Sequence, residues 1–336
     1  MSSELNTPQA QVALAARSNI IHDYYERVYG NAARVPSPGL LYHYTTADGL
    51  KGIIEGNELW ATSAYFLNDS AEISYGYDVL AEVLKDWIAN NPRPEDSLPI
   101  GLARDMEHTF GKDYREFIIK PIYLACFCEE DNLLSQWRTY GQSGGYSIGF
   151  QAHVEGPCGG LRPEPPVYTA KWVKVSYDRN EHIARCRQLL DLFLPLFDDH
   201  TLADALTTVD LPEHLGYSGF LRLLSEILVE ETMGFKNRAF DVEKEWRIVV
   251  RERELLKQET DDGGRTEPLI HSRSLRGVLT PYVKLVTPTG KPLPIASIRS
   301  GPTLDKRTAA MAIATLLDQN KYRRVFVHGS DISVRF

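Results

Sequence analysis

Residues 41–62, LYHYTTADGLKGIIEGNELWAT, are predicted to form a compact strand–helix–strand unit. Leu41–Tyr44 and Leu59–Thr62 are the two strand candidates, because aromatic and β-branched residues are common in strands. The helix between them is expected to begin after Thr45 or Thr46, since either hydroxyl can cap it. Three apolar residues fall on one face of that helix. They are Leu50, Ile53 and Ile54.

Helical segments are predicted on both sides of this unit. Apolar residues recur at helical spacing from about Gln9 to Tyr29, and a longer helix is expected over Ala71–Ile88. Gly56 is expected to take the left-handed conformation that ends the helix of the unit, because glycine has no Cβ to clash. Two leucine-rich stretches, 185–197 and 220–231, are also predicted to be helical.

Further strand candidates alternate with these helices in no regular order. They are Ile122–Cys128, Tyr146–Phe150, Tyr168–Tyr177, Glu245–Val250, Ile295–Arg299 and Arg324–His328. Because a regular β-α-β series is absent, we predict an α+β fold with a mixed or antiparallel sheet. We expect an N-terminal helical extension over 1–37, then a single elaborated domain over 38–336 with a helical insertion at about 180–235.

Composition and charge narrow the possible functions. The chain has 336 residues, is 43% apolar and carries a formal net charge of −8. This acidity disfavours a broad surface for polyanions, which needs clustered Lys and Arg, but a local basic groove stays open. No secretory signal or bilayer-spanning run is visible, and four scattered cysteines do not suggest a disulfide scaffold. We expect a cytoplasmic protein without membrane association, and the oligomeric state stays open.

Several familiar catalytic signatures are missing from the sequence. There is no phosphate-binding GxxxxGK[ST], no GxGxxG after a strand, no HExxH and no GxSxG nucleophile elbow at a strand-to-helix turn. Cys126 and Cys128 would share one strand face, but no second Cys/His pair follows at zinc-ligand spacing. We therefore expect inert thiols and no metal site.

Two polar motifs each have a structural and a functional interpretation. His43 precedes the expected helix N-terminus, where backbone N–H groups can bind an anion. It could equally be a core histidine that bonds a backbone carbonyl. In Asn68–Glu72, Asn68 or Asp69 can cap a helix and Glu72 favours the helix dipole, so capping explains this motif without a ligand.

An aromatic pair follows in the middle of the chain. Trp137 and Tyr140 are three residues apart and share a face if their segment is helical. They lie beside the glycine-rich segment 141–145. The two rings could clamp a planar group such as nicotinamide or a base, or they could fill the core beneath a turn.

The segment 243–250, EKEWRIVV, is the clearest strand late in the chain. Strand alternation places Glu243, Glu245 and Arg247 on one face, and the other face, with Trp246, is expected to be the buried one. A carboxylate with a cation two residues along could stay ionised while partly shielded from water. The alternative is a surface ion pair, which contributes only about 0–1 kcal/mol.

Taken in order, these motifs resemble the bacterial domain of unknown function 2971 family. The motifs are LYHYTT (41–46), NDSAE (68–72), CF (126–127) with SQWRTYG (135–141) and GYSIGF (145–150), and EKEWR (243–247). The resemblance covers most of residues 40–335. It names no activity.

The opening strand, helix and second strand are also similar to the start of the ADP-ribosyltransferase fold, including its DNA-modifying toxin branch. This resemblance implies that His43 helps to hold the ribose of NAD. It implies that Tyr140 or Trp137 stacks near the nicotinamide. It also implies that Glu245 or Glu243 engages the nicotinamide ribose, and the choice between these glutamates stays open.

The implied function is NAD-dependent ADP-ribosyl transfer by a toxin or anti-phage effector, with a nucleic acid or a protein as acceptor and no metal. Cleavage of the N-glycosidic bond develops positive charge that a carboxylate stabilises. His43, Tyr44 and Thr45 would fix the dinucleotide, while Arg247 would keep Glu245 ionised or contact a phosphate. The alternative is a noncatalytic nucleotide- or ligand-binding sensor in a bacterial defence system.

Overall fold

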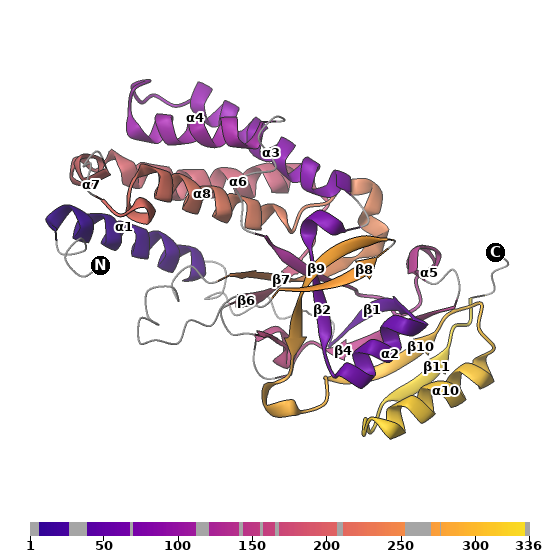
Figure 1. Cartoon of the computed structure of the whole chain (residues 1–336). Helices are drawn as coiled ribbons and strands as arrows, with labels where there is room; N and C mark the ends of the chain where they lie inside the picture. The colour runs from indigo at the N-terminus through magenta and orange to yellow at the C-terminus, as the bar shows by residue number, and fades with distance from the viewer. Residues whose placement is uncertain are drawn as a thin grey trace. The chain divides into compact units, whose positions relative to one another are not determined.

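A computed structural model describes most of the chain (Figure 1). The described residues are 7–26, 39–67, 70–111, 121–140, 144–154, 157–164, 168–206, 211–252, 270–275 and 277–332. They fall into two compact units. The helical unit comprises Met1–Ala32, Asp69–Lys120 and Ser176–Arg238, and the sheet unit comprises Ala33–Asn68, Pro121–Val175 and Ala239–Phe336. Together they confirm the α+β class.

The described part of the helical unit contains six α-helices. They are α1 (Pro8–Tyr25), α3 (Ser70–Ala89), α4 (Leu98–Phe110), α6 (Arg179–Phe193), α7 (His200–Leu206) and α8 (Tyr217–Thr232). α3 packs on α4, α6 and α8, and α1 packs on α7. The two leucine-rich helices predicted at 185–197 and 220–231 correspond to α6 and α8. They share their core with α3 and α4, which come from an earlier part of the chain.

The sheet unit contains eleven described strands in one sheet. They are β1 (Leu40–Thr46), β2 (Leu59–Ser63), β3 (Tyr123–Cys128), β4 (Gly145–Gln151), β5 (Arg162–Glu164), β6 (Tyr168–Lys174), β7 (Glu245–Glu252), β8 (His271–Leu275), β9 (Val278–Val286), β10 (Ile295–Ser300) and β11 (Phe326–Gly329). Their order is β11-β10-β4-β1-β3-β2-β9-β5, with β7 paired to β3, β6 to β7 and β8 to β9. β10 and β11 are parallel, and the other named pairs are antiparallel.

The predicted helix between the first two strands is α2 (Ala47–Gly56). Thr46 caps it, since its hydroxyl accepts the Gly49 N–H at 3.2 Å. The expectation for Gly56 was wrong: Asn57, with φ of 50°, takes the left-handed position. Its side chain is held by three hydrogen bonds, which fix a conformation that asparagine tolerates better than most residues. The partners are the Lys291 carbonyl, the Leu293 N–H and the Tyr322 hydroxyl.

The two faces of the sheet differ in polarity. Side chains of residues in register on neighbouring strands point to the same face. One face is apolar and includes Leu41, Phe127, Ile148, Trp246, Ile248 and Ile298. α2 and α10 (Lys306–Gln319) add their buried residues to this core. The opposite face, here called the polar face, includes Tyr42, Tyr44, Cys126, Cys128, Ser147, Glu245, Arg247 and Arg299.

Candidate functional site

The candidate site lies where the sheet divides at β3. One edge of β3 pairs with β7 along its length. The other edge is shared, since β1 pairs with it at Cys128 and β2 pairs with it at Tyr123 and Leu124. Figure 1 shows β1 and β2 running in different directions. We call the divided edge, at Ala125–Phe127, the β1–β2 fork.

His43 lies at this fork. Its Nδ1 is 2.9 Å from the carbonyl oxygen of Cys126, so the Nδ1 proton is donated to that carbonyl. Its ring contacts the Phe127 ring at 5.8 Å. Burial lowers the pKa of His43, and the charge of Arg273 acts in the same direction. His43 is therefore a neutral histidine that satisfies a backbone group, as its structural interpretation expected.

Removing His43 is expected to change how stability depends on pH. An unfolded histidine has a pKa of about 6.5. The pKa of His43 is lower in the folded chain. At pH values below about 6.5 the unfolded chain therefore binds more protons than the folded chain. The free energy of unfolding consequently decreases as the pH falls. Urea denaturation between about pH 7 and pH 5 should therefore show a smaller decrease for His43→Gln than for the wild type.

His182 should keep part of that pH dependence in the variant, since burial lowers its pKa as well. The dependence is thus expected to shrink and not to vanish. Identical pH profiles for the wild type and His43→Gln would contradict a half-buried, neutral His43.

Glu245 and Arg247 form a buried ion pair at the start of β7. Arg247 donates from Nε to Glu245 Oε1 at 2.8 Å and from Nη2 to Oε2 at 3.0 Å. Their side chains are 8% and 3% exposed. The surface ion pair proposed as the alternative is therefore wrong, and so is the expectation that only the Trp246 face is buried, since nearly every residue of β7 is buried. The planar guanidinium matches a carboxylate in this bidentate geometry.

Glu243 does not share the strand face of Glu245. It ends the short helix Arg238–Glu243, and Lys244 after it has φ of 45°, so the alternation expected from the sequence is interrupted. Burial and then nearby carboxylates, Glu243 among them, raise the pKa of the Cys128 thiol to about 12. The Cys128 thiol is therefore neutral. Within the described part of the chain, no cluster of three or more His, Cys, Asp or Glu residues could hold a metal ion.

Tyr44 and Trp137 are held in a small core beside α5 (Leu134–Tyr140). The Tyr44 hydroxyl donates to the Glu130 carbonyl at 2.8 Å and accepts the Leu133 N–H at 2.9 Å. The Trp137 ring lies 4.8 Å from the Tyr44 ring and is fully buried. Tyr140 is 37% exposed. The two aromatic residues of α5 thus do not present a pair of rings to one ligand.

The remaining predicted residues are dispersed. Thr45 lies in β1 beside His43 and is half-buried. Asn68 and Asp69 lie outside the described residues. Glu72 belongs to the helical unit, where it pairs with Lys236 at 3.3 Å and both side chains are 9% exposed. Of the predicted site residues, only Glu245 and Arg247 are brought together as a charged pair.

Sequence reasoning missed a second polar cluster on the same sheet face. Arg299 donates from Nε to Asp131 at 2.9 Å, and His328 Nε2 lies 3.3 Å from the same carboxylate oxygen. Burial and then the Asp131 charge raise the pKa of Tyr42. The parallel pairing of β10 with β11 places Arg299 beside His328, and no sequence spacing indicates that register.

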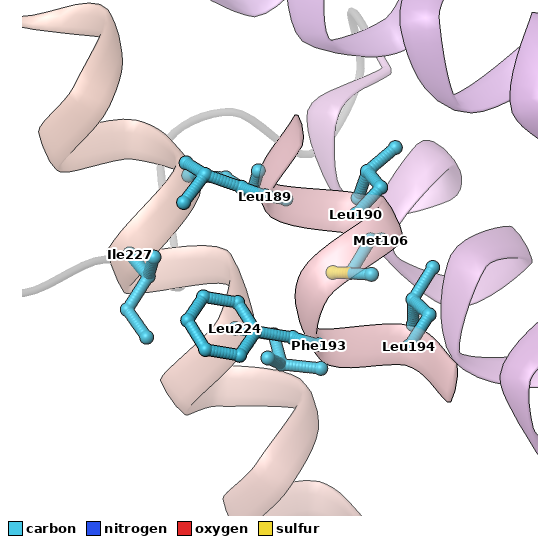
Figure 2. A pocket seen from close by; sticks show the side chains of 8 residues that line it. Met106, Leu189, Leu190, Phe193, Leu194, Leu224 and Ile227 are labelled. Carbon is cyan, nitrogen blue, oxygen red and sulfur yellow. The ribbon is translucent and has the colours of Figure 1, made fainter. Parts of the chain in front are cut away.

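A cavity in the helical unit does not suit a polar ligand (Figure 2). Its volume is about 10 Å³, close to the space that one water molecule needs. Eight apolar side chains line it: Met106, Leu189, Leu190, Phe193, Leu194, Leu224, Ile227 and Leu228. A ligand site normally adds a few polar groups that orient the ligand, and this lining supplies none.

Comparisons with known proteins bear on the middle of the chain. Neither the curated proteins nor the solved structures gave a match. No helix in the described ranges is long and apolar enough to cross a membrane. The sequence model of the family described as "Protein of unknown function (DUF2971)" matches residues 136–248, which include GYSIGF, EKEWR and most of SQWRTYG. Over residues 136–248 the chain is therefore similar to the DUF2971 family.

Proposed function

We propose that the chain is an NAD-dependent ADP-ribosyltransferase-like enzyme in which Glu245 acts on the nicotinamide ribose. The supporting observation is the buried bidentate pair of Glu245 and Arg247 on one central strand. The cation favours the ionised form of the carboxylate. An ionised carboxylate in a shielded position stabilises the positive charge that develops on the ribose as the glycosidic bond breaks.

The polar face provides further groups near this carboxylate. Tyr42, Cys128 and Glu245 are in register on three neighbouring strands, so Tyr42 is about 10 Å from Glu245 across the sheet. His43 follows Tyr42 in β1, so its side chain points to the opposite face of the strand. It would contact the nucleotide at the β1–β2 fork and not beside Glu245. The acceptor would be a nucleic acid or a protein, and the biological role that of a toxin or anti-phage effector.

A noncatalytic nucleotide- or ligand-binding sensor is the second candidate function. Both carboxylate oxygens of Glu245 already accept hydrogen bonds from Arg247. A carboxylate engaged in this way supports the sheet, and it needs to be released before it can contact a ribose hydroxyl. Binding of NAD without turnover would favour this function.

The release of nicotinamide from NAD by the purified chain tests the proposal. Glu245→Gln keeps the size of the side chain and removes its charge, so turnover should fall at least about 100-fold. Glu243→Gln should retain turnover, because Glu243 lies outside β7.

Glu231→Gln is a matched control for loss of a buried ion pair. Glu231 pairs with Arg185 at 2.5 Å in the helical unit, and both side chains are mostly buried. This variant should lose stability and keep turnover. Equal turnover by the wild type and Glu245→Gln would exclude Glu245 from the reaction, and no turnover with any acceptor would exclude the transferase.

A further inference from the structure

A second group of residues on the polar face lies on β2, β9 and β8. Trp60 stacks on Tyr282 with ring centroids 4.3 Å apart, and His271 stacks on Tyr282 at 5.3 Å. The Arg273 guanidinium lies 5.4 Å from the Trp60 ring and donates to the Thr62 hydroxyl at 2.9 Å. The register across β2, β3 and β7 places this group on the same face as Glu245.

Arg273 has no carboxylate partner among the residues that the structure describes. Four other arginines of low exposure pair with a carboxylate: Arg93 with Asp198, Arg185 with Glu231, Arg247 with Glu245 and Arg299 with Asp131. Arg273 is half-buried and is bonded to a neutral hydroxyl. Burial lowers the pKa of its guanidinium. A shielded cation is costly unless an anion compensates it.

Two buried nitrogen atoms beside the aromatic stack also lack hydrogen-bond partners among the residues that the structure describes. They are Arg273 Nε and His271 Nε2. Because these residues are two apart on β8, their side chains share one face and their Cα atoms are about 7 Å apart. Buried polar atoms without partners are rare in folded proteins. An acceptor-rich anion placed between the two nitrogens would satisfy both.

We propose that Arg273 and His271 bind the diphosphate group of a nucleotide on the polar face of the sheet. Phosphate oxygens are strong acceptors and match the planar fork of arginine. The ring faces of Tyr282 are already occupied on both sides by Trp60 and His271, so the site recognises phosphate and not a stacked base. The identification of the natural nucleotide as NAD rests on the proposed function.

Titration of the full chain with ADP, monitored by calorimetry, tests this site. The expected result is that Arg273→Gln weakens ADP binding at least tenfold, because charge-assisted hydrogen bonds to phosphate are lost, and that Arg273→Lys restores part of the affinity. His271→Gln should also weaken binding. Inorganic pyrophosphate should compete with ADP, while adenosine should not, which separates the phosphate from the base.

Lys284→Gln is the matched control. Lys284 lies on the adjacent strand β9, and its substitution by Gln removes one positive charge, as Arg273→Gln does. Lys284 differs from Arg273 because its ammonium group already pairs with Glu58 at 2.9 Å. Its affinity for ADP should stay within about twofold of the wild type. The proposal is overturned if ADP does not bind, if Arg273→Gln binds ADP as the wild type does, or if Lys284→Gln weakens binding as much as Arg273→Gln.

The same variants separate this proposal from the proposed function. ADP binding through Arg273 without nicotinamide release from NAD would support the phosphate site and exclude the transferase. Nicotinamide release that persists in Arg273→Gln with an unchanged KM for NAD would overturn the phosphate site and leave the transferase standing. A loss of thermal stability in Arg273→Gln with unchanged ADP binding would make Arg273 structural and overturn the site.

Discussion

Replacing Arg247 by Met is expected to lower the free energy of unfolding by about 3–5 kcal/mol, because the change removes the cation bonded to both oxygens of a buried carboxylate. Met fills a similar volume along the strand, so little of the loss should come from a cavity. Urea denaturation followed by circular dichroism measures the loss directly. The chain has two compact units that could unfold separately. The unfolding transition should therefore be followed with two spectroscopic probes, which coincide only if unfolding is two-state.

The double variant Glu245→Gln/Arg247→Met provides the control for this prediction. It removes both charges, and apolar or neutral replacements of buried ion pairs are often close to neutral in stability. The double variant should therefore be more stable than Arg247→Met alone. A cost below about 1 kcal/mol for Arg247→Met would match an exposed ion pair and contradict the burial of this one.

Eight of the eleven described strands, all except β5, β8 and β9, were predictable because their residues alternate or form short apolar runs. Residues 245–250 were recognised as a strand, yet the burial of both faces of β7 was not. That burial depends on β6 and β3, which pair with β7 from segments more than 70 positions earlier in the chain. Local alternation carries no information about such partners.

The fork in the sheet and the phosphate site depend on register and were not predicted. The hairpin of β8 and β9 was missed, and with it Arg273 and His271. Gly277, with φ of 80°, lies at its turn. A glycine between two runs of alternating residues is the signal that could have indicated this hairpin. That Arg273 has no carboxylate partner within the described ranges follows from the tertiary structure and not from local sequence.

Helix prediction was limited in another way. α1, α3, α6 and α8 were expected from apolar periodicity, whereas α4 was not. Pro99 is the second residue of this helix, and proline is tolerated in the first helical turn because its missing N–H has no partner within the helix there. The packing of α3 and α4 with α6 and α8 follows from tertiary contacts alone.

Trp137→Ala is expected to destabilise the chain by about 3–5 kcal/mol, as other truncations of large buried aromatic residues do. The indole is fully buried against Tyr44, and its Nε1 donates to Asn132 at 2.9 Å. Chemical denaturation measures the loss. If Trp137 were instead a ligand clamp, the variant would keep its stability and lose affinity for NAD.

Tyr140→Ala separates these two roles on the same helix. Tyr140 is 37% exposed at the end of α5, so its truncation should cost well under about 1 kcal/mol, as surface substitutions usually do. A large effect of Trp137→Ala on stability beside a small effect of Tyr140→Ala would place the first ring in the core and the second at the surface. Tyr140→Ala would then become the variant with which to test an aromatic contact to NAD, because any loss of affinity in it could not be attributed to unfolding.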